Sequence, residues 1–145
     1  MNYILDTCVV NWLIDGKIDR TDLPNDGDYL ITHIQVDEIN RTSDHHQDRR
    51  ARLSLMLHSL NVRLVPTEST VWDESRWDYT KLGDGAIYAS IKRRLDSLKR
   101  RDDSNVRDAL IAEVAIINGH ILLTADENLA TAAGEHGGAV RLFKV

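Results

Sequence analysis

The segment at residues 105–129, NVRDALIAEVAIINGHILLTADENL, constrains the fold more than any other part of the sequence. Apolar residues recur at helical spacing in its first half, which predicts a core-facing helix over residues 106–118. Gly119 can take the left-handed dihedrals that commonly end a helix. Residues 120–124 form a short apolar run without alternation, which is typical of a parallel strand covered on both faces. The segment therefore predicts a helix, a tight turn and a buried parallel strand.

The start and the apolar face of this helix can also be predicted. Ser104 or Asp103 can cap the start, because their side-chain oxygens can accept hydrogen bonds from the first backbone N–H groups. The residues that recur at helical spacing are Ile111, Val114, Ala115 and Asn118, and the apolar face is widened by Leu110 and Ile117.

An aspartate follows each of two predicted strands. Asp126 comes after the strand at residues 120–124, and Asp6 directly follows another short apolar run at residues 2–5. Ligands of open parallel sheets bind outside the carboxyl ends of the strands, so an acid in this place is a site candidate. One such aspartate is more simply the N-cap of the next helix. Two of them suggest carboxylates that converge on one site.

Converging carboxylates predict a bound cation. Like charges a few ångströms apart raise one another's pKa and destabilise the fold unless a cation lies between them. Oxygen ligands from Asp and Glu suit Mg²⁺ or Mn²⁺, whereas zinc favours His and Cys, which are not suitably spaced here. We therefore expect Mg²⁺ or Mn²⁺ as the cofactor.

The composition limits the class of protein. A chain of 145 residues, 42% hydrophobic and 28% charged, predicts one globular domain over residues 1–145. No apolar run reaches membrane-spanning length and no signal peptide is apparent, so we expect a cytoplasmic protein with no membrane partner. The single cysteine, Cys8, fits a reducing compartment, and its apolar neighbours favour a buried thiol over a nucleophile.

The charge distribution is more informative than the total. A formal net charge of −5 does not resemble a protein that binds nucleic acid by bulk charge. Two basic groups, at residues 49–52 and 92–101, can nevertheless contact phosphates. The simpler interpretation for any one of these residues is a solvated helix face, balanced in the second group by Asp96, Asp102 and Asp103.

Predicted strands alternate with predicted helices along the chain. The strands are expected at residues 2–5, 29–32, 62–65, 120–124 and 139–143, and the main helices at residues 6–14, 33–41, 47–60, 86–98, 106–118 and 130–136. A further short helix is expected within residues 67–82, packed through Trp72 and Trp77. This alternation predicts an α/β domain, and right-handed crossovers place the carboxyl ends of its parallel strands at one edge.

Two further acids lie within reach of that edge. Glu38 is on the helix that directly follows the second strand, although an exposed helix glutamate is the simpler interpretation if its position is ignored. Asp84 lies near the start of the helix at residues 86–98 and is interpreted as a cap rather than an outer member of the acidic site.

The assembled motifs resemble the PIN domain family, a metal-dependent ribonuclease fold that includes the VapC-like toxins of toxin–antitoxin pairs. The resemblance rests on the opening YILDT, on THIQVDEINR, on RDALIAEVAIINGHILLTAD and on a final short strand, in that order. It implies a three-layer α/β/α fold with a central, parallel, five-stranded sheet. The middle of the chain has no motif that matches the family, which leaves the choice of substrate open.

The family's site residues can be transferred to matching positions. Its four acids, which would bind Mg²⁺ or Mn²⁺, fall on Asp6, Glu38, Asp108 and Asp126. Thr7 and Thr124 match hydroxyl residues of the family and would orient waters or carboxylates. Asp108 would lie in a first helical turn, where the helix dipole favours its ionised form.

The resemblance implies an endoribonuclease in which metal-activated water hydrolyses an RNA phosphodiester bond and leaves a 5′-phosphate. A toxin of this class would form a homodimer and be held by an antitoxin whose peptide covers the acidic groove. A free-standing RNA-processing nuclease is an alternative role. An alternative from a different functional class is a non-catalytic PIN-like protein that binds RNA or assembles a complex.

Overall fold

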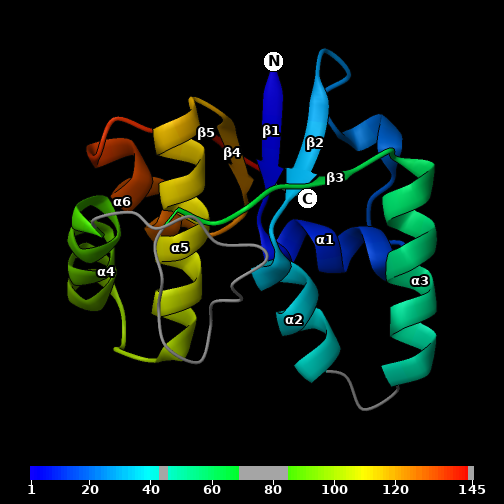
Figure 1. Ribbon diagram of the computed structural model, residues 1–145, viewed down its shortest axis with the longest axis horizontal. Helices are drawn as coiled ribbons and strands as arrows, with labels where there is room; N and C mark the ends of the chain where they lie inside the picture. The colour runs from blue at the N-terminus through cyan, green and yellow to red at the C-terminus, as the bar shows by residue number, and fades with distance from the viewer. Residues whose placement is uncertain (43–45, 69–84, 144–145) are drawn as a thin grey trace.

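A parallel sheet forms the centre of the protein (Figure 1). The structure is a computed structural model and describes residues 1–42, 46–68 and 85–143. In these residues the sheet has five strands, in the order β3-β2-β1-β4-β5, and every neighbouring pair is parallel. The strands are β1 (Asn2–Leu5), β2 (Asp28–Ile31), β3 (Arg63–Leu64), β4 (Ile121–Thr124) and β5 (Ala139–Leu142). The predicted parallel sheet is confirmed.

Helices cover both faces of this sheet (Figure 1). They are α1 (Thr7–Ile14), α2 (His33–Thr42), α3 (His46–Ser59), α4 (Ala86–Leu98), α5 (Asp103–Asn118) and α6 (Glu127–Glu135), with a 3₁₀ turn η1 (Arg20–Asp22). Helices α4, α5 and α6 lie on one side, and α1, α2 and α3 lie on the other. The predicted three-layer α/β/α architecture is confirmed.

The alternation of side chains along each strand explains the two cores. Ile4 and Leu122 point into the core under α4, α5 and α6, whereas Leu5 and Leu123 point into the core under α1 and α3. All four side chains are buried. Because both faces are covered at the centre of the sheet, β1 and β4 are continuous apolar runs rather than alternating ones.

Helix α5 begins earlier than predicted, because its N-cap is not one of the predicted residues. It begins at Asp103, and its N-cap is Asp102, whose carboxylate accepts a hydrogen bond from the Ser104 backbone N–H at 2.8 Å. The predicted caps, Ser104 and Asp103, are therefore wrong by one or two positions. Gly119 ends the helix with φ 69°, as expected.

Two other details of the prediction differ from the structure. Ile117 was expected on the apolar face of α5 but is 47% exposed, because the apolar stripe continues into a last turn that its neighbours do not cover. Helix α6 begins at Glu127, before the predicted residue 130, since Asp126 caps it. The expected helix within residues 67–82, with Trp72 and Trp77, falls almost wholly in residues 69–84, outside the described residues, as does Asp84.

The strand order creates a crevice at the carboxyl ends of β1 and β4. From β1 the chain proceeds to β2 and β3 on one side, and later returns to β4 and β5 on the other. A sheet whose order reverses in this way has its ligand site at that topological switch point.

None of the described helices is both long and apolar enough to cross a membrane.

Candidate active site

Asp6 is fixed at the carboxyl end of β1 by interactions on both carboxylate oxygens. Oδ1 accepts a hydrogen bond from the Thr7 backbone N–H at 2.8 Å, at the start of α1. Oδ2 accepts from the Thr124 hydroxyl at 2.7 Å and contacts the Cys8 thiol at 3.3 Å. The Asp6 backbone N–H also donates to the Leu123 carbonyl at 3.0 Å, which ties the acid to β4.

Thr124 connects the two acids that follow the central strands. Its hydroxyl oxygen donates to Asp6 and accepts a hydrogen bond from the Asp126 backbone N–H at 3.0 Å. Thr124 is fully buried, so water does not compete for either bond. The Thr124 hydroxyl therefore bridges Asp6 and Asp126, in addition to the backbone bond between Asp6 and Leu123.

Asp126 has two separate roles in the structure. Oδ1 caps α6 by accepting from the backbone N–H groups of Asn128 at 2.9 Å and Leu129 at 3.2 Å. Oδ2 points elsewhere and lies 3.4 Å from the Lys99 ammonium. Asp126 is thus both a helix cap and a member of the acidic site.

Asp108 lies in the second turn of α5, because the helix begins at Asp103. Its Oδ2 is 3.2 Å from Lys99, and its side chain is 13% exposed. Burial raises the pKa of Asp108 to about 7, the negative charges of Asp6 and Asp126 add to this effect, and Lys99 opposes it. The predicted placement in the first turn, with the ionised form favoured, is therefore wrong, because Asp108 lies further into the helix and burial raises its pKa.

Opposing effects also act on the pKa of Asp6. Burial raises the pKa of Asp6, against the hydrogen bonds from Thr124, Cys8 and Thr7 that favour its ionised form. Burial also raises the pKa of the Cys8 thiol to about 12, with a further contribution from the Asp6 charge. Cys8 is therefore a poor nucleophile, because the thiolate is the reactive form.

Glu38 reaches the same site from α2. Its Oε2 accepts a hydrogen bond from Arg107 Nε at 2.7 Å, and each of the two side chains is 17% exposed. Arg107 precedes Asp108 on α5, so this ion pair joins α2 to the helix that carries another acid of the site.

These side chains line one open pocket of about 330 Å³. Its lining residues are Asp6, Thr7, Cys8, Asn11, Glu38, Lys99, Ser104, Asp108 and Asp126. Five of the six predicted site residues are among them, and Thr124 bonds to two of the acids from within the protein. The structure adds Lys99, which the sequence indicated only as a member of the basic group at residues 92–101.

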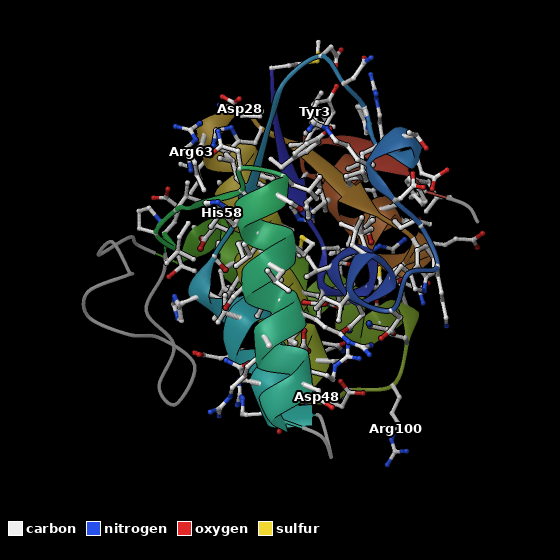
Figure 2. The ribbon with its side chains drawn as sticks, turned by 90° about the vertical axis from the view of Figure 1, so that its right-hand side faces the viewer. Tyr3, Asp28, Asp48, His58, Arg63 and Arg100 are labelled. Atoms are coloured by element: carbon white, nitrogen blue, oxygen red, sulfur yellow. The ribbon has the colours of Figure 1, made fainter. Side chains whose placement is uncertain are left out.

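Of the other members of the two basic groups, Arg49 also reaches the pocket, because its guanidinium donates to Oδ1 of the lining residue Asn11 at 2.6 Å. Arg49 pairs with Asp15 at 2.6 Å, and Arg94 pairs with Glu135 at 2.7 Å. Arg100 is exposed and extends from the end of the molecule opposite Tyr3 (Figure 2). Lys99 differs from its neighbour Arg100 because it points inward.

The chemistry of the pocket fits a hard divalent cation. Its candidate ligands are carboxylate oxygens, and their mutual repulsion requires a compensating charge. The Thr7 hydroxyl oxygen is buried with no hydrogen-bond partner among the described residues, so it is available to a ligand or a water. In the described parts of the chain, however, no three acidic, histidine or cysteine side chains lie close enough to bind one ion together.

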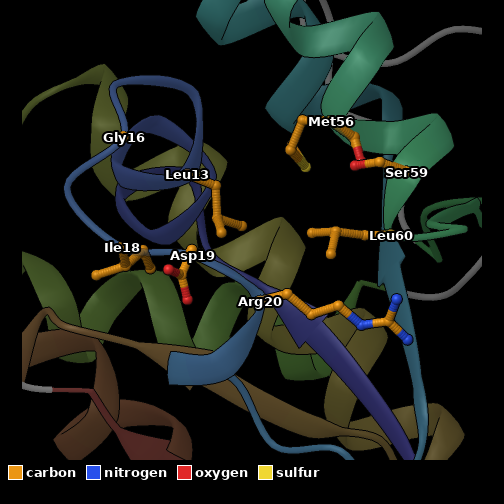
Figure 3. Close-up of a pocket in the computed structure, with 8 residues that line it drawn as sticks. All are labelled: Leu13, Gly16, Ile18, Asp19, Arg20, Met56, Ser59 and Leu60. Atoms are coloured by element: carbon orange, nitrogen blue, oxygen red, sulfur yellow. The ribbon is translucent and has the colours of Figure 1, made fainter.

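A larger hollow lies elsewhere, between the end of α1 and α3 (Figure 3). Its volume is about 470 Å³, and its lining residues are Leu13, Gly16, Ile18, Asp19, Arg20, Met56, Ser59 and Leu60. It contains none of the predicted site residues. The two carboxylates whose pKa values are raised, Asp6 and Asp108, line the smaller pocket.

The fold and the pocket define a class of protein, namely an α/β domain with an acidic site at the switch point of a parallel sheet. A profile of the PIN domain matches residues 3–135, so the chain belongs to the PIN domain family. Among curated protein sequences, none matches the chain significantly.

Several solved structures share the fold. One is VapBC2 from Rickettsia felis, whose structure was determined in complex with a DNA fragment from its promoter. It has 15% identity and a TM-score of 0.62, and the match covers 99% of this chain and 100% of that chain. VapBC-1 from nontypeable Haemophilus influenzae has 16% identity and a TM-score of 0.59, covering 99% and 98%. VapBC-5 from Mycobacterium tuberculosis, a member of the VapBC family of toxin–antitoxin systems, has 20% identity and a TM-score of 0.50, with the same coverage.

Proposed function

We propose that this protein is a Mg²⁺- or Mn²⁺-dependent endoribonuclease and the toxin of a toxin–antitoxin pair. The observation that carries the proposal is the acidic pocket at the switch point of the sheet, which four carboxylates from different elements line. Membership of the PIN domain family and the shared fold with VapBC proteins support it.

Asp6, Glu38, Asp108 and Asp126 would hold the metal ion. A bound Mg²⁺ or Mn²⁺ supplies a water of lowered pKa and neutralises charge on the scissile phosphate. Asp6 is firmly positioned, because both of its oxygens accept hydrogen bonds before any ligand binds. The Thr124 hydroxyl would keep Asp6 and Asp126 at a fixed spacing through its two hydrogen bonds. The Thr7 hydroxyl is free to orient a water.

The substrate that we propose is single-stranded or looped RNA. Its splayed nucleotides can enter a narrow pocket that a regular duplex cannot reach. Because the whole protein is acidic, we expect modest affinity that falls steeply as the salt concentration rises.

The partners that we propose are an antitoxin and a second copy of the chain. VapBC-5 belongs to a toxin–antitoxin family and shares this fold, which supports an antitoxin partner. Co-expression with the product of the adjacent gene, followed by light scattering of the purified complex, tests both partners. A monomer that does not bind the neighbouring gene product contradicts this part of the proposal.

A PIN-like protein that binds RNA without cutting it is the second candidate. Two observations favour it: Lys99 already neutralises Asp108 and Asp126, and the described acids do not form a three-ligand cluster. Cleavage assays separate the two candidates, because only the nuclease produces new RNA ends.

The decisive experiment is cleavage of a labelled pool of transfer, ribosomal and messenger RNA with Mg²⁺, with Mn²⁺ and with EDTA. Asp6→Asn is compared with wild type and with Asp28→Asn. Asp28 is the exposed first residue of β2, at the edge of the sheet opposite the pocket, so Asp28→Asn makes the same chemical change away from the site. We expect metal-dependent cleavage by wild type and by Asp28→Asn, and a loss of at least about a hundredfold in Asp6→Asn. Equal cleavage by all three proteins would refute the assignment of the site.

A further inference from the structure

Lys99 occupies an unusual position for a lysine side chain. It is the C-cap of α4, with an extended backbone whose N–H donates to the Leu95 carbonyl at 3.0 Å. Its ammonium lies 3.2 Å from Asp108 and 3.4 Å from Asp126, and its side chain is only 22% exposed. The side chain of Arg101, two residues later, is 80% exposed. Lysine normally keeps its ammonium in water, so this inward placement requires a cause.

The connection between α4 and α5 supplies that cause. The fully buried Asn105 donates from its amide to Asp96 Oδ1 at 2.8 Å and to the Arg100 carbonyl at 3.2 Å. Asp96 also pairs with Lys92 at 2.8 Å. The backbone that carries Lys99 is therefore fixed on both sides, and its side chain is directed into the pocket by the fold.

The electrostatics of the pocket give Lys99 a role. Asp108 and Asp126 contribute two carboxylates, and the Lys99 ammonium compensates part of their charge. A divalent cation held by these acids would take over that compensation, and the Lys99 ammonium, which lines the same pocket, would then be available to a phosphate of a bound substrate. Lysine binds phosphate well, as a compact point charge on a flexible stem.

We propose that Lys99 is a phosphate-binding residue that exchanges partners. It neutralises Asp108 and Asp126 in the free protein and binds a phosphate of the RNA when a divalent cation occupies the acids. This inference rests on the proposed nuclease function, and it assigns that site a residue that competes with the metal ion and then contacts the substrate. Two measurements test it, one of which does not depend on activity.

The first measurement is a Mn²⁺ titration followed by thermal unfolding, since a ligand that binds only the folded state stabilises it. Lys99→Met removes the competing ammonium, so we expect it to bind Mn²⁺ about tenfold more tightly than wild type, within the usual range of coupling between two sites. Lys99→Gln, which keeps a polar side chain, should shift the affinity in the same direction. Lys17→Met, an equal loss of charge at an exposed position beyond the far end of α1, should match wild type.

The second measurement is RNA cleavage by the same variants at saturating Mn²⁺. Lys99→Met should lower kcat/KM by about tenfold or more, and Lys99→Arg, which retains the charge, should restore part of it. The salt dependence of KM should also weaken in Lys99→Met by about one phosphate contact. Lys17→Met should again behave as wild type.

The outcomes distinguish failure of this inference from failure of the proposed function. If wild type neither binds Mn²⁺ nor cuts RNA, the nuclease proposal fails, and the role of Lys99 fails with it. If wild type does both, and Lys99→Met has unchanged Mn²⁺ affinity or unchanged kcat/KM, the partner exchange alone is overturned.

Discussion

Asp6 and Asp126 each cap a helix with one carboxylate oxygen, and each uses the other for a side chain, Thr124 for Asp6 and Lys99 for Asp126. An aspartate at an N-cap normally uses its spare oxygen for water. Here the second oxygen of Asp126 faces Lys99, whereas the second oxygen of Asp6 accepts from the buried Thr124 hydroxyl, so the caps also fix both carboxylates at the same crevice. The cap and the site are therefore one structural arrangement, and a substitution that removes the carboxylate affects stability and function together.

Thr124→Val tests the hydroxyl that joins these two acids. The change preserves shape but removes the donor to Asp6 and the acceptor for the Asp126 N–H, both in buried surroundings. We expect a loss of about 1–3 kcal/mol in the free energy of unfolding, measured by urea denaturation. We also expect a smaller stabilisation by Mn²⁺.

Two companion variants control for this change. Thr124→Ser keeps the hydroxyl and should recover most of the Mn²⁺ response. Thr131→Val makes the same substitution at an exposed position on α6 and should change stability by no more than about 0.5 kcal/mol. If Thr124→Val is as stable as Thr131→Val, the bridging hydroxyl is not important for the fold.

Single residues were predictable where a positional rule applied to them. Asp6 and Asp126 follow predicted strands, so the rule for parallel sheets was enough to select them. Lys99 could not be selected, because its direction depends on the connection that Asn105 fixes, and this contact is invisible in the sequence. The protonation of Asp108 was also beyond prediction, since it depends on burial by the whole pocket.

At the scale of elements, the turn between α5 and β4 offers a clean test. Gly119 has φ 69°, and a Cβ there would meet no described atom within 4 Å, so any effect of Gly119→Ala comes from the backbone alone. We expect Gly119→Ala to destabilise the protein by about 1–2 kcal/mol in urea denaturation.

Gly134 is the matched position, because it lies within α6 and its Cβ would also meet no described atom within 4 Å. Gly134→Ala should stabilise the protein by about 0.5–1 kcal/mol, since alanine is the better helix former. Opposite signs for the same substitution would confirm that the conformation at Gly119 matters. Equal effects would show that the left-handed turn is not a constraint.

The elements themselves were largely predictable from periodicity and turn residues. The strands and helices of the described residues occur where they were expected, because apolar spacing records which face is buried. Their exact ends were less predictable, since the first residue of α5 depends on Asp102 as a cap and that of α6 on Asp126. Either of two neighbouring polar residues can cap a helix, and tertiary contacts decide between them.

For the whole molecule, the buried acids predict how stability depends on pH. Asp6 and Asp108 have pKa values raised by folding, so the folded protein binds more protons than the unfolded chain. The stability from this protonation is present below the ordinary pKa of aspartate, 3.8, and for Asp108 is lost as the pH rises through about 7.

Urea denaturation in EDTA at about pH 5 and about pH 8 measures this effect, and Asp108→Asn removes one of the two groups. We expect the stability of wild type to fall between these values and the fall to be smaller in Asp108→Asn. Mn²⁺ should stabilise wild type more at the higher pH, because protons compete with the metal for the carboxylates. A wild-type profile identical to that of Asp108→Asn contradicts this prediction.

The order of the strands also determines when the site exists during synthesis. When the ribosome has synthesised the chain through α2, Asp6 and Glu38 are present, but Asp108 and Asp126 have not yet been synthesised. Since β4 must then pair beside β1 before these acids can meet, the nascent chain has no complete pocket until translation of this region is almost finished. If the protein is a toxin, the cell that makes it is protected from each unfinished copy by the topology of the sheet itself.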